Sequence, residues 1–152
     1  VITILVCGHD VVIIMHKEGD ALLIQQPVYY PFSEVIKNDG RRLVNCQLRY
    51  ENNHYSIDFE RMEKMIQEEG VKALIFCNPH NPVGRIWTPE EQRMVAEICC
   101  QNGVFLIADE IHADLALGKH KMVPFMKACP EPQPESMPAV ISFSRDIRSQ
   151  AA

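Results

Sequence analysis

Two short motifs carry the side chains best suited to chemistry. Residues 78–84 read Asn-Pro-His-Asn-Pro-Val-Gly, and Asp109 opens the run Asp-Glu-Ile-His 25 residues after Gly84. In the first motif, Pro79 and Pro82 stiffen the backbone, and each biases the preceding asparagine toward an extended conformation. A stiff loop can hold the Asn81 amide where it donates to a ligand oxygen. The alternative is an ordinary polar turn, since Asn and Pro favour turns for conformational reasons.

The second motif places a carboxylate directly after an apolar run. Such a carboxylate must be hydrogen-bonded, paired or functional, because an isolated buried charge is costly. Asp109 is therefore a candidate site residue, with a helix or loop cap as the alternative. His112 is a second candidate, and whether it shares a face with Asp109 depends on the turn. No standard zinc spacing links these residues to Asp114 or His120, so we expect no metal site.

The elements that must position these residues are short buried strands. Residues 73–77 precede the first motif and residues 104–108 the second, and both runs are wholly apolar. Such runs are typical of strands buried on both faces of a parallel sheet. Ligands bind at the carboxyl edge of open α/β sheets, so both motifs should converge on one crevice. Tyr29 and Tyr30 would place an aromatic ring after a further strand, with a core tyrosine as the alternative.

The remaining pattern predicts an α/β fold, a mostly parallel sheet with flanking helices, in one domain spanning residues 1–152. Further strands are expected at 21–24, 42–48 and 139–143, and helices at 31–38, from Asp58 to Gly70, and from the capping box Thr88-Pro89-Glu90-Glu91 to about Gln101. We predict a loop at 51–56 and a Pro-rich loop at 123–138, with one helical turn near Met126. For residues 2–16 the sequence leaves strand and helix open.

Composition limits the class of protein. The chain has 152 residues, 47% hydrophobic and 23% charged, and a formal charge of −5. These values fit a globular protein and argue against nucleic acid or an anionic membrane as the main partner. Six cysteines without a C-x-x-C pair indicate buried reduced thiols. We find no signal peptide and no stretch long enough to span a bilayer, and we expect a cytoplasmic protein. Because the chain starts with Val1, we interpret it as a processed or excised piece.

Together the motifs resemble the large domain of pyridoxal-phosphate enzymes of the aspartate-aminotransferase fold. The resemblance is strongest to the cystathionine β-lyase branch (the MalY/PatB type), for which Asp-Glu-Ile-His is the specific element. It rests on residues 78–84, 87–91, 109–114, Gly19-Asp20 and Gln26-Pro27-Val28-Tyr29. The match runs from about 19 to 118, the central part of a longer family member, and residues 1–18 match poorly.

This resemblance implies a cofactor, pyridoxal 5′-phosphate, and an amino-acid substrate. It implies that Asp109 pairs with the protonated pyridine nitrogen and keeps the ring an electron sink. It also implies that Asn81 hydrogen-bonds the ring's phenolic oxygen, that Tyr29 stacks on the ring, and that His112 lies near the same oxygen.

Three departures from the family's pattern accompany the matches. The family's Schiff-base lysine follows the next strand, where this chain reads Ser142-Phe143-Ser144-Arg145-Asp146-Ile147. Arginine stays protonated and cannot form an imine, so Arg145 is no substitute. Thr3 stands where a glycine-containing phosphate loop is expected. The small domain is missing, and residues 145–152 look unlike the family, as a tail.

We therefore expect a fragment of a C–S lyase or aminotransferase that is inactive as this chain and binds its cofactor weakly or not at all. The sequence does not choose between lyase and transaminase. The alternative is a non-catalytic α/β module that self-associates through exposed sheet edges, and a homo-oligomer is expected. A nucleotide-binding domain is disfavoured because the glycine fingerprint is missing.

Overall fold

A computed structural model of the chain describes residues 3–7, 10–14, 17–115, 121–130 and 140–143. Its centre is a five-stranded sheet with the order β4-β3-β7-β8-β9, in which every neighbouring pair is parallel. The strands are β3 (Ala21–Ile24), β4 (Arg42–Asn45), β7 (Val71–Cys77), β8 (Phe105–Asp109) and β9 (Val140–Phe143). The predicted α/β class with a parallel sheet is confirmed.

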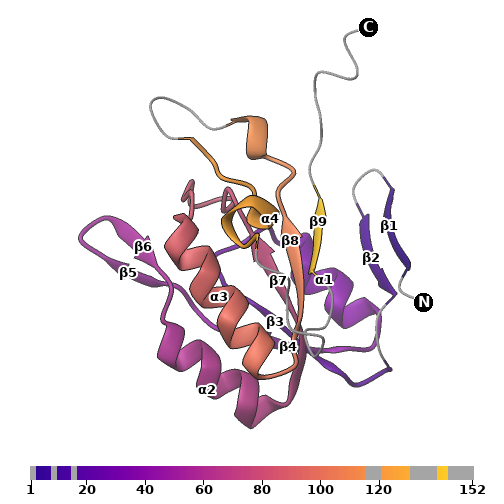
Figure 1. Ribbon diagram of the computed structural model, residues 1–152. Helices are drawn as coiled ribbons and strands as arrows, with labels where there is room; N and C mark the ends of the chain where they lie inside the picture. The colour runs from indigo at the N-terminus through magenta and orange to yellow at the C-terminus, as the bar shows by residue number, and fades with distance from the viewer. Residues whose placement is uncertain (1–2, 8–9, 15–16, 116–120, 131–139, 144–152) are drawn as a thin grey trace, which may run out of the picture.

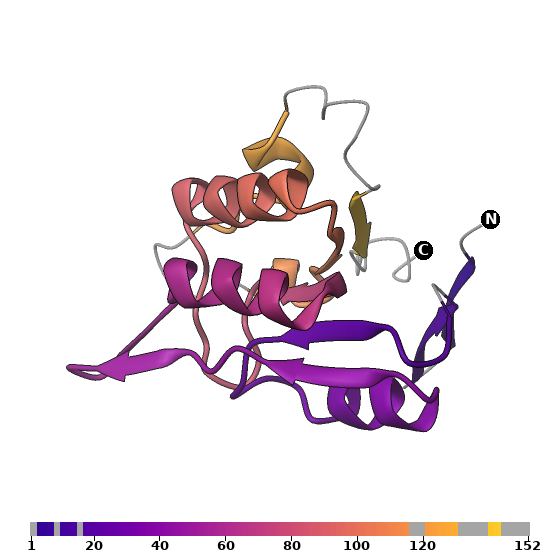
Figure 2. The same ribbon diagram turned by 90° about the horizontal axis from the view of Figure 1, so that it is seen from below.

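Helices cover both faces of this sheet (Figure 1). On one face lie α2 (Phe59–Glu69), α3 (Pro89–Gln101) and the short α4 (Phe125–Ala128), and on the other lies α1 (Pro31–Asn38). The view from below separates the layers, with α2 and α3 on one side of the strands and α1 on the other (Figure 2). A 3-10 turn, η1 (Ala113–Leu115), follows β8.

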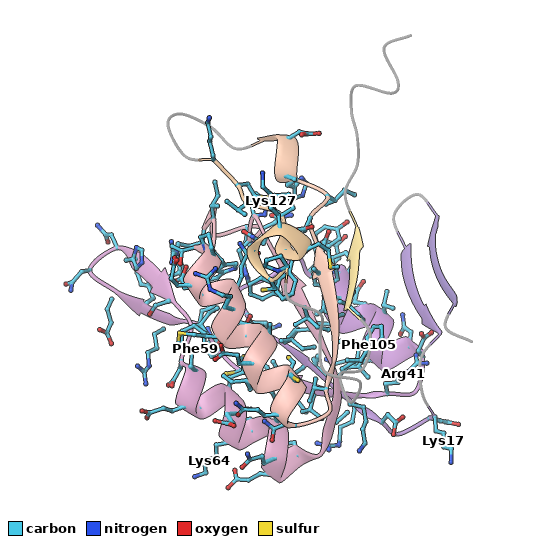
Figure 3. The ribbon with its side chains drawn as sticks, viewed as in Figure 1. Lys17, Arg41, Phe59, Lys64, Phe105 and Lys127 are labelled. Carbon is cyan, nitrogen blue, oxygen red and sulfur yellow. The ribbon has the colours of Figure 1, made fainter. Side chains whose placement is uncertain are left out.

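Alternating side chains divide the core into two clusters. In β7, Leu74 and Phe76 are buried against α2 and α3, whereas Ile75 is buried in the cluster that includes Phe32 of α1. Figure 3 shows Phe59 at the start of α2 and Phe105 in β8, which belong to opposite clusters. Burial on both faces explains why these strands are wholly apolar in the sequence. It also fixes where their carboxyl ends lie.

The helices on the α2 side begin and end at the predicted residues. Asp58 accepts a hydrogen bond from the Arg61 N–H at 3.1 Å, and Gly70 ends α2 with a φ of +59°. At the start of α3, the Glu91 N–H donates to Thr88 Oγ1 at 3.2 Å, and the Thr88 N–H donates to Glu91 Oε2 at 2.7 Å. This is the predicted capping box, which satisfies two amides that the helix leaves unpaired.

The prediction of a loop at 51–56 was wrong. Strands β5 (Arg49–Glu51) and β6 (His54–Ser56) form an antiparallel hairpin. Asn52 and Asn53 make the two-residue turn with φ values of +50° and +59°. Asparagine tolerates this left-handed conformation, and two such residues in succession favour a tight hairpin. The Tyr50 and Tyr55 rings, 4.5 Å apart between centroids, add a cross-strand pair.

Two other features were left open or predicted differently: the secondary structure of the N-terminal segment and the end of β4. The N-terminal segment is strand rather than helix, because β1 (Thr3–Cys7) and β2 (Asp10–Ile14) pair antiparallel in a sheet of their own. Strand β4 ends at Asn45, three residues before the predicted end, and the Asn45 side chain bonds to Gln26 at 2.8 Å. The predicted helical turn near Met126 is α4.

The tail at 145–152 and residues 131–138 of the Pro-rich loop lie outside the described residues. No described helix is long and apolar enough to cross a membrane.

Candidate functional site

The two motifs lie next to each other at the carboxyl edge of the sheet. Cys77 and Asp109, the last residues of β7 and β8, are register partners. Just beyond them, the Asn78 N–H donates to the Asp109 carbonyl at 2.9 Å. The loop that carries Asn81 and the turn that carries His112 therefore leave the sheet side by side, as predicted.

The loop after β7 is held by its own hydrogen bonds. The Trp87 N–H donates to Asn78 Oδ1 at 3.1 Å, and Trp87 Nε1 donates to the Cys77 carbonyl at 3.0 Å. The Arg85 guanidinium lies 4.6 Å from the centroid of the Trp87 ring and pairs with Glu91 at 2.6 Å. Because these bonds close the loop over the strand end, the loop has one conformation in which to present Asn81.

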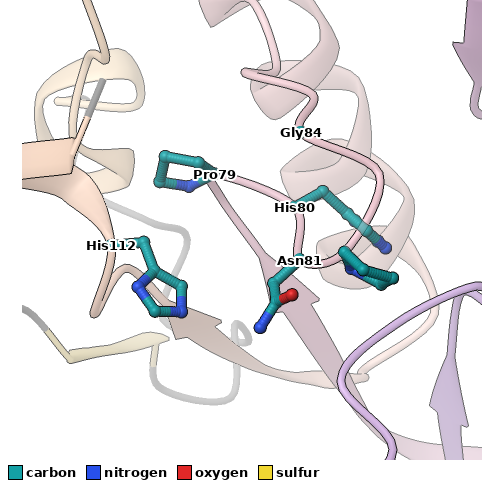
Figure 4. Close-up of a pocket in the computed structure, with 6 residues that line it drawn as sticks. Pro79, His80, Asn81, Gly84 and His112 are labelled. Carbon is teal, nitrogen blue, oxygen red and sulfur yellow. The ribbon is translucent and has the colours of Figure 1, made fainter. Parts of the chain in front are cut away.

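Asn81 and His112 line one hollow. Its volume is about 300 Å³, and its lining residues are Pro79, His80, Asn81, Pro82, Gly84 and His112. Figure 4 shows the Asn81 amide and the His112 ring projecting to the same side, from the loop after β7 and from the turn after β8 respectively. Among the described residues, no hydrogen bond to the Asn81 side-chain amide is found. The amide is free to bind a ligand.

Asp109, the last residue of β8, is half-buried at this edge. Burial raises the pKa of its carboxyl group, while the Ile111 N–H, a nearby His112 charge and the Cys77 thiol act in the opposite direction. The Ile111 N–H donates to Asp109 Oδ1 at 3.2 Å, and Cys77 Sγ is 3.9 Å from Oδ2. Within the part of the chain that the structure describes, no lysine or arginine pairs with Asp109. A bound cation would supply the missing charge.

Tyr29 lies in the turn after β3 at the same sheet edge, but it does not line the hollow. Its half-buried ring contacts Tyr30 at 5.8 Å and Phe32 at 5.6 Å between centroids. A second hollow, of about 520 Å³, lies beside this turn and is lined by Gln26, Pro27, Val28, Tyr30, Ser33, Glu34 and Gln47. The structure thus brings Asn81 and His112 together in one hollow and leaves Asp109 at the end of β8 and Tyr29 in the neighbouring turn, neither of which lines it.

Sequence reasoning missed His80. Its side chain is 1% exposed, and its Nε2 lies 3.1 Å from the Gln25 carbonyl and 3.0 Å from the Pro27 carbonyl. A histidine between two Asn-Pro pairs reads as part of a turn, and only the tertiary contact reveals its role. Among the described residues, no three His, Cys, Asp or Glu side chains form a group that could hold a metal ion.

Comparison with known proteins identifies the family. The sequence profile of the aminotransferase class I and II family matches residues 8–147, so the chain belongs to this family. It is 41% identical over 109 residues to the cystathionine β-lyase PatB of Bacillus subtilis, and the match covers 72% of this chain and 28% of PatB. It is 29% identical over 109 residues to the protein MalY of Escherichia coli. The chain spans about a third or less of the length of these relatives.

Solved structures agree with this assignment. Cystalysin from Treponema denticola, which contains pyridoxal 5′-phosphate, is 38% identical with a TM-score of 0.76, and the match covers 84% of this chain and 32% of cystalysin. The pyridoxal-phosphate-bound C–S lyase of Staphylococcus hominis is 34% identical with a TM-score of 0.77, covering 85% of this chain and 32% of that one. The resemblance inferred from the motifs is confirmed, and the fold corresponds to part of these enzymes.

Proposed function

We propose that this chain forms the ring-binding part of a pyridoxal-phosphate site of the C–S lyase or aminotransferase type, and that it does not turn over amino acids by itself. The observation that carries the proposal is the half-buried Asp109 carboxylate, which pairs with no lysine or arginine among the described residues and ends the strand next to the loop that presents the Asn81 amide. A ring with a protonated nitrogen and a phenolic oxygen matches both groups.

Each side chain has a physical role in this proposal. Asp109 accepts from the pyridine N–H, and its burial strengthens that ion pair because little water competes. Asn81 would donate to the phenolic oxygen, with His112 beside it, and Tyr29 of the neighbouring turn would cover the ring face. When bound, the cofactor supplies an electron sink for charge that develops at the amino acid's Cα.

The proposed lack of turnover rests on the residues that follow β9. That strand pairs with β8, and Phe143 lies opposite Asp109. The family's lysine would follow at once, but residues 144–147 are Ser-Arg-Asp-Ile. No side chain in this run can form a covalent bond with the cofactor and then move the substrate's α-proton. Binding is therefore expected to be weak and non-covalent.

A titration with pyridoxine 5′-phosphate tests the ring site. This molecule carries an alcohol in place of the aldehyde, so surface lysines cannot react with it. Quenching of Trp87, the only tryptophan, would report binding. We expect saturable binding that Asp109→Asn and Asn81→Ala each weaken about tenfold or more, the loss of about 1.4 kcal/mol that a charged hydrogen bond supplies. Equal binding by wild type and both variants would overturn the proposal.

Borohydride treatment of a mixture with pyridoxal 5′-phosphate tests the second part. We expect no stoichiometric, site-specific covalent adduct by mass spectrometry. An adduct on one lysine that is lost in Asp109→Asn would mean that another lysine has taken over, and the claim of inactivity would fall.

Self-association is a second proposal, and the described residues favour it less. Strand β4 forms one edge of the sheet but has four residues, and it begins with Arg42, which pairs with Glu69 of α2. Short, charged edges resist pairing with another chain. The large hydrophobic side chains that are most exposed, Tyr30, Tyr50 and Met126, come from three different elements. Light scattering on the purified chain would decide, and a dimer of concentration-independent mass would support the module.

A further inference from the structure

We infer that His80 is a positioning residue that, as the neutral tautomer protonated at Nε2, ties the loop bearing Asn81 to the turn bearing Tyr29. The inference rests on the proposed ring site and names what aligns its two halves. His80 lies in the loop after β7, and its two carbonyl neighbours belong to the turn after β3. No other side chain in the described part of the chain hydrogen-bonds from one of these two loops to the other.

The tautomer follows from the partners. Two carbonyl oxygens, at 3.1 and 3.0 Å, accept hydrogen bonds only, so Nε2 must carry the proton that they share. Nδ1 is buried without a hydrogen-bond partner within the described residues. A proton there would leave a donor unsatisfied in the interior, which is costly. Burial is the largest effect on the pKa of the His80 ring and lowers it, which favours the neutral form, whereas the carbonyls of Pro27, Gln25 and Cys77 act in the opposite direction.

The ring is held on its other side as well. It contacts the Trp87 ring edge-to-face, with 5.5 Å between centroids and 89° between planes. The His80 N–H donates to the Arg85 carbonyl at 2.7 Å, and the Gly84 N–H donates to the His80 carbonyl at 2.8 Å. Backbone and ring are therefore fixed together. Because the His80 ring is fixed in its own loop and hydrogen-bonded to the turn after β3, it sets the position of the loop after β7 relative to that turn.

The turn that His80 binds is the one that delivers Tyr29. The carbonyls of Gln25 and Pro27 lie four and two residues before Tyr29, on either side of Gln26. The Gln26 N–H donates to Asn45 Oδ1 at 3.0 Å, and its carbonyl accepts from the Leu48 N–H at 2.8 Å. His80 thus holds one face of the turn and β4 the other. Without the His80 hydrogen bonds, the turn would keep its contact with β4, but its position relative to the loop that carries Asn81 would no longer be fixed.

The tautomer can be measured directly on the wild-type chain. Long-range ¹⁵N–¹H spectra of labelled protein distinguish a protonated Nε2 from a protonated Nδ1. We expect the His80 signals of a neutral ring protonated at Nε2 at pH 7. A ring protonated at Nδ1, or at both nitrogens, would overturn the inference.

Two variants separate positioning from packing. His80→Gln places an amide with two N–H groups near the two carbonyls, whereas His80→Phe keeps a ring and removes the donor. We expect His80→Phe to accelerate amide exchange at Gln26 and Leu48 with α2 unchanged, and to weaken pyridoxine 5′-phosphate binding about tenfold. His80→Gln should restore both. Uniform acceleration that includes α2, or no rescue by glutamine, would contradict the inference.

The two proposals fail in different ways. If the wild-type chain does not bind pyridoxine 5′-phosphate, the ring site is wrong, but the tautomer and the exchange of Gln26 still report whether His80 ties the loops. If the wild-type chain binds and neither variant changes binding or exchange, His80 has no positioning role and the ring site stands.

Discussion

The loop after β7 and the turn after β8 lie at the same edge of the sheet, but they satisfy their polar groups differently. In the loop, Asn78, His80 and Trp87 bond to protein atoms and close the backbone on itself. In the turn, the half-buried Asp109 carboxylate has one backbone N–H and a distant thiol as hydrogen-bond partners. The loop is held by several hydrogen bonds to protein atoms, although Asn78 Nδ2 and His80 Nδ1 have no partner among the described residues, whereas the Asp109 carboxylate has few partners and could accept more from a ligand. We therefore expect substitutions in the loop to lower the stability of the fold and substitutions in the turn to weaken ligand binding.

Within the turn itself, the adjacent carboxylates of Asp109 and Glu110 differ in the same way, one available to a ligand and the other bonded to the fold. Glu110 is 2% exposed and accepts from the Phe125 N–H at 2.6 Å, which fastens α4 to the sheet. Asp109 is only half-buried, and it ends β8 at the sheet edge where the loop with Asn81 begins. A charged acceptor on a backbone N–H is a strong hydrogen bond. Glu110 thus serves the fold, and Asp109 is left for the site.

The largest expected effect comes from breaking the loop. Trp87→Ala removes a side chain that is 1% exposed, together with its hydrogen bond to Cys77. We expect a loss of about 3–5 kcal/mol in the free energy of unfolding. Urea denaturation followed by circular dichroism would measure it. The exposed Met94 of α3 is the matched control, and Met94→Ala should change stability by less than about 0.5 kcal/mol.

A smaller loss is expected at Glu110. Glu110→Ala leaves the Phe125 N–H buried without this acceptor and should cost about 1–3 kcal/mol in the free energy of unfolding. Glu110→Gln keeps an oxygen in place and should cost less. Equal losses for the two variants would mean that the charge, rather than the hydrogen bond to Phe125, fastens α4. Exchange of the Phe125 amide gives an independent reading.

The cap that follows the loop should contribute less again. Thr88→Ala removes the oxygen that accepts from the Glu91 N–H, and we expect a loss of about 1 kcal/mol. Thr88→Ser keeps the hydroxyl and should stay close to wild type. The same urea experiment measures both variants. If Thr88→Ala were neutral, the capping box would hold the loop no better than water does.

The sequence predicted those parts of the molecule in which local chemistry decides the structure. The capping box at Thr88, the stop at Gly70 and the apolar strands follow from residues that are close in the chain, and all were confirmed. The Asn52-Asn53 hairpin was missed although its signal was local, because the polar stretch 51–56 was interpreted as a loop. His80 could not be found in this way, since its partners lie 53 and 55 residues away.

The smallest expected effect on stability is at Asp109. Because burial raises the pKa of its carboxyl group above 3.8, the folded chain holds this proton more tightly than the unfolded chain does. The stability it contributes is present below pH 3.8 and is lost as the pH rises through the folded pKa. Asp109→Asn removes this loss, so at pH 7 we expect the variant to be as stable as wild type or more stable, by less than about 1 kcal/mol.

Urea midpoints of wild type and Asp109→Asn between pH 4 and 7 would measure the difference, which should grow with pH. A strongly destabilised variant would mean that Asp109 serves the fold as Glu110 does, and the contrast between the two carboxylates would collapse. A stable variant that no longer binds pyridoxine 5′-phosphate would instead mean that the Asp109 carboxylate is needed for binding and not for the stability of the fold. Substituting a residue that stabilises the fold usually lowers the free energy of unfolding. A half-buried carboxylate whose removal leaves the fold intact therefore argues for a ligand that it binds.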